Sequence, residues 1–290
     1  MKLSFVGGDM RIVSLASGFH RDGHEVCSFA LENAPPFDGL SCSLSLEACV
    51  AGADCIVLPL PLTNLHGGLN APLSSRNISP MELLEALPRS AVICAGKPDG
   101  EITARALELG LDFVDYYARE ELVALNALAT AEGALSIMLQ SSPRTIWESR
   151  VLIIGFGRIG KMLAERLRAL GALVSISARK AGDRAYIRTI SCSSLDIGET
   201  DIELEEFDFV INTVPAPILN RARLEQLSPN ALCIDLASRP GGVDFEAAHE
   251  LGLRAIWALG LPAETAPETS GEIIRETLMN ILHEKRGNIC

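Results

Sequence analysis

Short apolar runs alternate with amphipathic stretches along nearly the whole chain. In the first half, apolar runs of strand length are separated by segments with helical spacing, such as 80–87 and 101–110. Parallel strands need a long connection between them, so this alternation predicts a parallel sheet with crossover helices. The strands expected in this half cover residues 2–8, 25–30, 55–61, 91–97 and 112–117.

A long helix is predicted over residues 119–140, because this stretch contains no Pro and ends at the turn signal Ser-Ser-Pro-Arg. The strand–helix alternation restarts after it, so we interpret this helix as a bridge between two domains. A last helix over 268–285 has apolar residues along one side and must pack on another element. The strands expected after the bridge cover 150–155, 172–178, 208–214, 231–237 and 254–259, and a helix is expected over 158–170.

Composition narrows the class of protein. A length of 290 residues suggests two domains, and 48% apolar with 21% charged residues excludes disordered and collagen-like chains. The net charge of −12 repels phosphate backbones, which excludes general nucleic-acid binding. No uninterrupted apolar run approaches the roughly 18 residues of a membrane helix, and the N-terminus lacks the features of a signal peptide. We therefore expect a cytoplasmic protein that binds neither nucleic acid nor membrane.

Eight cysteines raise the question of disulfides or a metal site. None are spaced as C-x-x-C, and Cys55, Cys94 and Cys233 lie within apolar strand-like runs. This pattern favours reduced cysteines, and no metal site is predicted.

The most informative motif is VLIIGFGRIG at 151–160, where G-x-G-x-x-G follows an apolar strand and precedes an amphipathic helix. Within a strand–loop–helix–strand unit this pattern indicates dinucleotide binding, although the pattern alone is weak and a turn without a ligand is the alternative. The glycines allow a tight turn, close approach of the backbone to the pyrophosphate and close helix–strand packing, and the helix N-terminus adds positive potential. The predicted cofactor contacts here are Gly155, Gly157, Arg158, Ile159 and Gly160.

The end of the next strand indicates which dinucleotide is bound. An NAD-selective site places an acid about 20 residues past the motif, to hold the ribose 2′-hydroxyl. No acid occurs between Glu165 and Asp183, whereas Arg179 and Lys180 lie where a 2′-phosphate would be. We therefore predict NADP as the cofactor, bound by both cations; a solvated strand end is the alternative.

Two later strand ends are expected to border the same ligands, because ligands of open parallel sheets bind beyond the carboxyl ends of strands. The run FVINTVP ends in small polar residues that suit the nicotinamide ribose, and LCIDLA ends the next strand. The predicted cofactor contacts from these strand ends are Asn212, Thr213, Val214, Pro215 and Ala237.

Arg239 follows the second of these strand ends and precedes a Pro-Gly-Gly sequence. A guanidinium binds a carboxylate through two parallel hydrogen bonds, and Pro-Gly-Gly gives a stiff loop that then allows close approach. A structural ion pair with Asp235 or Asp244 is the alternative. The predicted substrate contacts in this loop are Arg239, Gly241 and Gly242.

Three other segments carry candidate chemistry. Gly7-Gly8-Asp9 with Arg11 follows the first strand, but it is no second dinucleotide motif, because the third glycine is missing and Asp9 would repel a pyrophosphate. His66, in a Gly-rich loop, is a candidate proton carrier or else an ordinary loop histidine. The segment Asp196–Asp208 holds seven acids and no base, which predicts a solvated loop and short helix or a docking surface for a basic partner.

Several strings together resemble the A-subunit family of dipicolinate synthases, oxidoreductases that make the pyridine-2,6-dicarboxylate of bacterial spores. The most specific is DLASRPGG followed by an acid and Phe, within 235–245; GLP and APETSG follow at 260–271. TAEG at 130–133 and GGD-x-R at 7–11 also match. The resemblance covers nearly the full length and fades mainly at 62–80 and 97–118.

The resemblance implies an α/β fold of two doubly wound parallel-sheet, Rossmann-like domains joined by a long interdomain helix. The implied domains are a flavodoxin-like substrate domain of residues 1–118 plus 268–290, the bridging helix 119–141, and an NADP-binding domain of residues 142–267. The last helix would return to the first domain, which gives its apolar face a place to pack.

The resemblance also implies the chemistry: a dihydro- or hydroxytetrahydro-dipicolinate gives a hydride to NADP⁺ and becomes an aromatic pyridine. A small dianionic substrate needs local cations in so acidic a chain, and Arg239 and Arg11 are the candidates, with Gly8 and Asp9 beside Arg11. Ser238 or His66 could assist proton removal, so the predicted catalytic residues are Arg239, Ser238 and His66.

A second, B-type subunit is implied as a partner, and we also expect a homo-oligomer. Two alternatives remain: an NADP-dependent dehydrogenase of an amino or 2-hydroxy acid, and an NADP-binding subunit without catalysis of its own.

Overall fold

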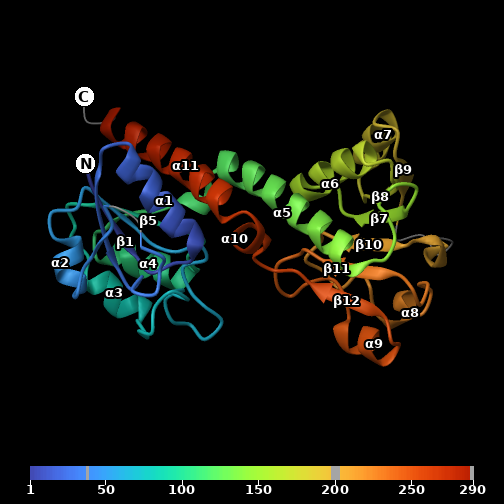
Figure 1. The fold of residues 1–290 in the computed structure, drawn as a ribbon, viewed down its shortest axis with the longest axis horizontal. Helices are drawn as coiled ribbons and strands as arrows, with labels where there is room; N and C mark the ends of the chain where they lie inside the picture. Colours follow the sequence, from blue (N-terminus) through green and yellow to red (C-terminus); the bar gives the residue numbers. More distant parts are fainter. Residues whose placement is uncertain (37–38, 197–202, 288–290) are drawn as a thin grey trace. The chain divides into compact units, whose positions relative to one another are not determined.

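The computed structural model describes residues 1–36, 39–196 and 203–287, drawn in Figure 1. The chain divides into two compact units. The first unit consists of Met1–Asn126 and Ala266–Cys290, and the second of Ala127–Thr265. Helix α5 (Glu120–Ser141) contributes residues to both units, so one junction lies inside the helix that the sequence predicts as a bridge.

The first unit contains a six-stranded parallel sheet in the order β3-β2-β1-β4-β5-β6. The predicted strands form, but each is shorter than its apolar run. The edge strand β3 was not predicted, because its two residues are exposed and carry no apolar pattern. Without β3 the order is that of a flavodoxin-like sheet, and with β3 it matches the order of the second unit. The strands are β1 (Lys2–Val6), β2 (Glu25–Phe29), β3 (Ser41–Cys42), β4 (Cys55–Val57), β5 (Val92–Ala95) and β6 (Asp112–Asp115).

Helices cover both faces of this sheet. Side chains of α1 and α11 pack with Leu3, Phe5 and Val57 on one face, whereas α2, α3 and α4 pack with Val6, Ile56 and Ile93 on the other. Alternate residues of one strand thus face opposite cores, which is why strands of this kind are apolar throughout. The helices are α1 (Met10–Arg21), α2 (Leu46–Val50), α3 (Pro80–Ala86), α4 (Gly100–Glu108), α11 (Pro267–Gly287) and a 3₁₀ turn, η1 (Tyr116–Ala118).

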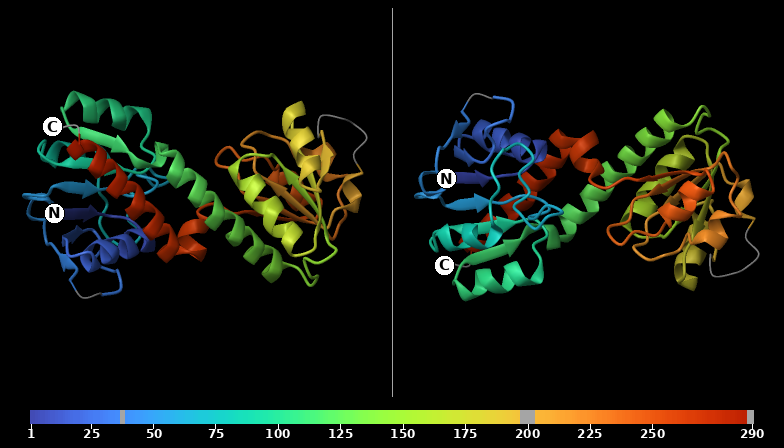
Figure 2. Two further views of the ribbon diagram at one scale, coloured as in Figure 1. Left: turned by 90° about the horizontal axis from the view of Figure 1, so that it is seen from above. Right: turned by 90° about the horizontal axis from the view of Figure 1, so that it is seen from below.

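The last helix, α11, packs along α1 in the first unit, as Figure 2 shows. A Cβ added at Gly271 would lie 2.7 Å from the Arg11 carbonyl oxygen, so the two helices approach closely there. The apolar side of α11 enters the core that α1 covers, which confirms that this face returns to the first domain. Its buried residues are Ile273, Ile274, Leu278, Ile281 and Leu282.

The second unit also contains a six-stranded parallel sheet, in the order β12-β11-β10-β7-β8-β9. This order, with the reversal between β7 and β10, is that of dinucleotide-binding folds. The predicted fold of two doubly wound parallel sheets is therefore confirmed. The strands are β7 (Arg150–Ile154), β8 (Leu173–Ser177), β9 (Ser193–Leu195), β10 (Phe209–Asn212), β11 (Leu232–Asp235) and β12 (Arg254–Trp257).

Helices α5 and α6 cover one face of this sheet, with Ile153 and Ile211 among the buried contacts, and α8 and α9 cover the other, with Ile154 and Val210. The sequence did not resolve several short elements here, because they span few residues and carry little periodicity. The helices are α6 (Arg158–Ala169), α7 (Ala181–Thr189), α8 (Arg221–Leu224), α9 (Phe245–Glu250), α10 (Leu261–Thr265) and a 3₁₀ turn, η2 (Leu204–Glu206).

Helix α5 is long and apolar enough to cross a membrane by length and composition, which counting uninterrupted apolar runs did not reveal. This corrects the reading of the chain as having no such segment. Of its most apolar 18-residue window, however, 44% is buried inside the protein. Ala131, Ala134 and Met138 are fully buried in the core of the second unit, where α5 packs against α6 and the sheet. These three residues pack as core residues do, and the expected cytoplasmic location stays a prediction.

Candidate functional site

The glycine loop that follows β7 leaves the start of helix α6 open. Gly155 has φ +102°, a conformation that favours glycine, and its N–H donates to the Ser177 carbonyl at the end of β8 (2.9 Å). Gly157 is the N-cap of α6 and offers no side-chain hydrogen bond. The first N–H groups of α6 therefore have no side-chain cap, which is the arrangement that binds an anion at a helix N-terminus.

The two later glycines of the motif differ sharply in their surroundings. A Cβ added at Gly160 would lie 2.2 Å from the Gly155 carbonyl oxygen, so the helix and the loop touch at this point. A Cβ added at Gly157 would meet nothing within 4 Å. Gly160 thus serves packing within the protein, whereas the space beside Gly157 is open to a ligand. Of their neighbours, Arg158 is exposed and Ile159 is half-buried against the core.

Two exposed cations, Arg179 and Lys180, follow β8. Neither makes an ion pair with a residue that the structure describes. Lys180 is the N-cap of α7 and makes no side-chain capping bond, so a second uncapped helix start lies beside the two positive charges. The nearest downstream acid, Asp183, is in the first turn of α7. Arg184, by contrast, is occupied by Asp196 (2.8 Å) and by the carbonyl oxygens of Ala178 and Arg179.

The end of β10 is organised from within the protein. Asn212 is fully buried, and its amide group donates to the carbonyl of Val214 (2.9 Å) and to Asp235 Oδ1 (2.7 Å). Its side chain is therefore not exposed for direct contact with a nucleotide, and it orients the strand end instead. Thr213 donates to the Ile154 carbonyl (2.9 Å) beside the glycine loop, and Pro215, further along, is exposed.

Asp235 fixes the loop that carries Arg239. Its carboxylate is fully buried and accepts from Asn212 Nδ2, from Ala237 N (3.0 Å) and from Gly242 N (2.7 Å). The N–H of Gly241 donates to the Ser238 carbonyl (2.9 Å). Gly241 and Gly242 are both buried, and their N–H groups are used inside the loop and are not available to a substrate. The contact of these two glycines with substrate stays a prediction. The two glycines thus lie close to other parts of the protein.

Arg239 has an exposed side chain and makes no ion pair with any described residue. The alternative of a structural pair fails for both acids considered, because Asp235 is occupied as above and Asp244 caps α9 by accepting from Ala247 N (3.0 Å). The Arg239 guanidinium instead lies over the Trp257 ring, 5.6 Å from its centroid. Ser238 is exposed next to it.

In the first unit, the predicted substrate cation Arg11 is buried and already neutralised. Its guanidinium pairs with Asp9 (2.8 Å) and donates to the Leu60 carbonyl. Asp9 also caps α1 by accepting from Arg11 N (3.0 Å), and Gly8 is buried with φ +112°. Because both charges of the pair are compensated, Arg11 is a structural link between α1 and the segment after β4. Its predicted role as a substrate cation stays a prediction, and the pair with Asp9 leaves it no uncompensated charge.

His66 lies at the tip of an exposed loop that Asn64 holds together. The N–H groups of His66 (2.9 Å) and Gly68 (3.2 Å) both donate to Asn64 Oδ1. No described residue hydrogen-bonds the imidazole of His66, so nothing within the first unit orients it as a general base. The ordinary-loop interpretation is the simpler one for this histidine.

A lysine that the motif search did not single out stands at the carboxyl end of β5. Lys97 is exposed, has φ +53°, and donates its backbone N–H to Asp115 Oδ1 (2.9 Å). Its Nζ lies 5.9 Å from the centre of the Tyr117 ring and makes no ion pair with a described residue. A non-glycine residue in the left-handed region is uncommon and worth examining for function. The rule that selected Arg239, a cation past a strand end, would have found it.

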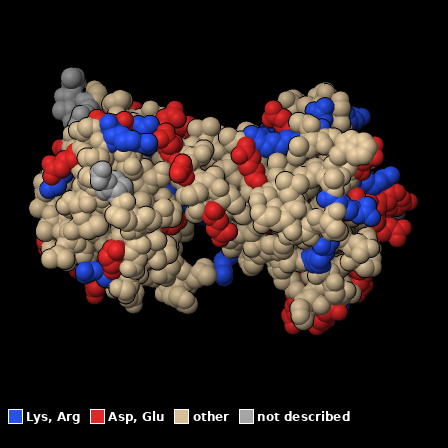
Figure 3. Space-filling model, viewed as in Figure 1, with Lys and Arg blue, Asp and Glu red and all other residues tan. Residues whose placement is uncertain are grey.

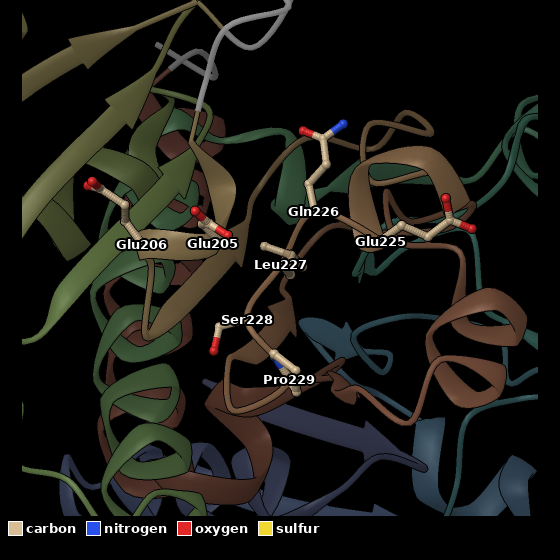
Figure 4. A pocket seen from close by; sticks show the side chains of 7 residues that line it. All are labelled: Glu205, Glu206, Glu225, Gln226, Leu227, Ser228 and Pro229. Carbon is tan, nitrogen blue, oxygen red and sulfur yellow. The ribbon is translucent and has the colours of Figure 1, made fainter.

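A surface pocket of about 460 Å³ in the second unit is lined by three glutamates and four uncharged residues. Glu205 and Glu206 precede β10, and Ser228 and Pro229 precede β11, so the pocket opens at the amino ends of the strands (Figure 4). Ligands of open parallel sheets bind at the carboxyl ends, so this is not the predicted dinucleotide site. Of the acidic segment Asp196–Asp208, residues 197–202 lie outside the described residues, and its proposed docking role stays a prediction.

Comparison with known proteins finds a family match for each half of the chain. Residues 2–117 match the N-terminal domain of the dipicolinate synthase A-subunit, and residues 119–251 match the NAD-binding domain of D-isomer specific 2-hydroxyacid dehydrogenases. The dipicolinate synthase A-subunit of Bacillus subtilis (strain 168) is 29% identical over 287 residues, which are 98% of this chain and 96% of that protein. The chain is therefore similar to the dipicolinate synthase A-subunit along nearly its whole given length.

Solved structures extend the comparison. The crystal structure of the dipicolinate synthase A-subunit from Bacillus halodurans has a TM-score of 0.86 at 27% identity and covers 97% of both chains. D-lactate dehydrogenase from Escherichia coli has a TM-score of 0.64 at 16% identity, covers 99% of this chain and 97% of that one, and shares the fold alone. The chain is thus an oxidoreductase related to the dipicolinate synthase A-subunit, with a dehydrogenase-type nicotinamide dinucleotide domain.

Proposed function

We propose that this chain oxidises dihydrodipicolinate, or its hydrated 4-hydroxytetrahydro form, to dipicolinate in sporulation with NADP⁺ as the oxidant. The single observation that carries the proposal is Arg239. It is an exposed guanidinium without an ion-pair partner among the described residues, at the carboxyl edge of a sheet with the dinucleotide strand order. The full-length relatives supply the substrate class.

Acidic and basic side chains lie in small groups among uncharged surface on the face seen in Figure 3. A net charge of −12 gives a dicarboxylate no general attraction to this surface, so binding needs a specific cation. Arg239 supplies one, and its planar fork matches a carboxylate.

The protein's task in this reaction is to bind and orient, and bound NADP⁺ would supply the redox chemistry by accepting a hydride from the ring. Oxidation of a dihydropyridine removes one hydride and one proton and leaves an aromatic ring, so the dihydro substrate needs no other co-reactant. The hydrated form must also lose water. Arg239 holds a carboxylate so that the ring carbon that loses hydride is fixed in one place. Ser238, exposed beside it, is the candidate for assisting the proton's departure.

The choice of NADP⁺ rests on the end of β8. Arg179, Lys180 and the uncapped start of α7 together present positive charge and N–H donors without an acid before Asp183. We expect NADP⁺ to bind at least about tenfold more tightly than NAD⁺, equivalent to roughly 1.4 kcal/mol. Titration of both dinucleotides against the purified chain measures this. Equal affinities, or an Arg179→Ala variant with an unchanged preference, would contradict the assignment.

A second, B-type subunit is proposed as the partner, by analogy with the subunit naming of the relatives. The chain alone is then expected to bind NADP⁺ but to turn over the dipicolinate precursor poorly. The decisive assay follows NADPH formation from dihydrodipicolinate by the purified chain, with and without that subunit. Full activity of the chain alone would reject the two-subunit proposal.

The same assay separates the remaining alternatives. Turnover of alanine or a 2-hydroxy acid in place of dihydrodipicolinate would favour the general dehydrogenase. NADP⁺ binding without any turnover, even with the second subunit, would favour a cofactor-binding subunit that is not itself catalytic.

A further inference from the structure

Trp257 is held in a fixed position at the end of β12. Its indole Nε1–H donates to the Ala237 carbonyl (3.0 Å), which belongs to the loop that carries Arg239. Its ring stacks on Phe245, with centroids 5.5 Å apart and an interplanar angle of 14°. A Cβ added at Gly241 would lie 3.0 Å from the ring, so the loop backbone also packs against it. Three contacts from one loop and one helix therefore fix this indole.

The Arg239 side chain lies beside this ring. Its side chain is exposed and has no hydrogen bond or ion pair with the described residues, and a free arginine samples many rotamers. The guanidinium carbon instead lies over the Trp257 ring, 5.6 Å from its centroid. The separation is within the range of a cation–π attraction, which is strongest for Trp.

We propose that Trp257 is a positioning residue: its ring holds the Arg239 guanidinium where it meets a carboxylate of a small aromatic or dihydroaromatic acid. The inference rests on the proposed function, because that function places a dicarboxylate at Arg239. Trp257 itself belongs to no functional sequence motif. Trp257 acts through Arg239, and carboxylate binding at Arg239 alters the surroundings of the indole.

Dipicolinate itself, the stable product, is the probe. The chain has two tryptophans, so Trp147→Phe leaves Trp257 as the sole indole emitter. Trp147 is exposed and lies away from the Arg239 loop, against Gly171, so this background should bind ligand normally. Titration of dipicolinate into this variant, saturated with NADP⁺, should change the indole emission saturably. An emission that stays constant while equilibrium dialysis detects binding would overturn the proposal.

Four variants of the full chain, measured by equilibrium dialysis, separate positioning from packing: Trp257→Leu, Trp257→Phe, Arg239→Ala and the double variant. Trp257→Leu removes the ring and should raise the Kd for dipicolinate about three- to tenfold while leaving the Kd for NADP⁺ unchanged. Trp257→Phe keeps an aromatic face and should restore most of the affinity, even though it loses the hydrogen bond to Ala237. In an Arg239→Ala background, Trp257→Leu should cause no further loss, because the group it positions is gone.

The contrary outcomes are distinct. Equal losses from Trp257→Leu with and without Arg239, or a parallel loss of NADP⁺ affinity, would assign Trp257 a structural role and overturn the inference alone. Thermal melts of each variant identify any that fails to fold, and the Phe variant then carries the test. If the unaltered chain does not bind dipicolinate at all, the proposed function fails, and the inference with it.

Discussion

The two glycines that differ most in their surroundings give the sharpest prediction. Gly157→Ala and Gly160→Ala each add one methyl group, three residues apart in the same motif. At Gly160 the new Cβ would lie 2.2 Å from the Gly155 carbonyl oxygen, about 0.8 Å inside the 3.0 Å limit that real Cβ atoms keep. Backbone must shift to relieve this overlap, which costs about 1–3 kcal/mol in a well-packed site.

Gly157→Ala should behave in the opposite way. Its Cβ meets nothing within 4 Å, and φ is −80°, so the folded protein is not strained. Reduced freedom of the unfolded chain stabilises by about 0.4–1 kcal/mol, and the poorer N-cap offsets a similar amount. We therefore expect unchanged stability but at least about tenfold weaker NADP⁺ binding, roughly 1.4 kcal/mol, because the methyl group fills space that the pyrophosphate needs.

Urea unfolding without cofactor, and calorimetric titration with NADP⁺, measure the two quantities separately. Gly160→Ala should lose stability, and its cofactor affinity should fall as a consequence of the shifted loop. A Gly157→Ala protein that binds NADP⁺ like the unaltered chain would show that the open space beside Gly157 is not the cofactor site. Equal stability of both variants would refute the packing argument.

The remaining predictions concern charged residues. Arg239→Lys keeps the charge but loses the planar fork, so kcat/KM should fall by at least about tenfold with NADP⁺ affinity near normal; an unchanged kcat/KM would make Arg239 structural. Arg11→Met leaves Asp9 without its partner and should lower the free energy of unfolding by about 3 kcal/mol, as measured by urea titration. Loss of activity at unchanged stability would instead make Arg11 a substrate ligand. Two hydrogen bonds from Arg119 (2.8 and 2.6 Å) lower the pKa of Glu284 below its ordinary 4.5. The stability that this pair adds is therefore present above about pH 4.5 and is lost as the pH falls through the lowered pKa. In thermal melts, Glu284→Gln should therefore have a lower melting temperature than the unaltered chain at neutral pH, and the two melting temperatures should converge in acid. A difference in melting temperature that grows in acid would contradict the assignment.

The elements that could be predicted were those with a strong local pattern. Strands such as β7 and β10 are buried on both faces and therefore apolar throughout, and α11 repeats its apolar residues at helical spacing. The glycine motif could be placed for the same reason, since its strand and helix frame it. Short elements such as β3 and α8 carry too few residues for any period to appear.

Side-chain roles that depend on distant partners could not be predicted. Arg11 looks like a substrate cation in the sequence, but in the fold it pairs with Asp9 and donates to the Leu60 carbonyl. Asn212 looks like a ligand contact, but Asp235, on a neighbouring strand and 23 residues away, draws its amide into the interior. Trp257 shows no motif at all, because its importance comes from the loop that folds over it. For Asn212 and Trp257 the deciding contact is made only when segments far apart in the chain become neighbours. For Arg11 this is true of the Leu60 carbonyl, whereas Asp9 lies two residues away.

The most direct test of the account is the stoichiometry of the reaction. The chain, together with a B-type subunit, is given dihydrodipicolinate and either NADP⁺ or NAD⁺, and NADPH or NADH and dipicolinate are quantified in the same sample. We expect one dipicolinate for each NADPH, with NADP⁺ strongly preferred and with both products formed at least about tenfold more slowly by Arg239→Lys. Dipicolinate formed without nicotinamide reduction, or equal rates with NAD⁺, would contradict it.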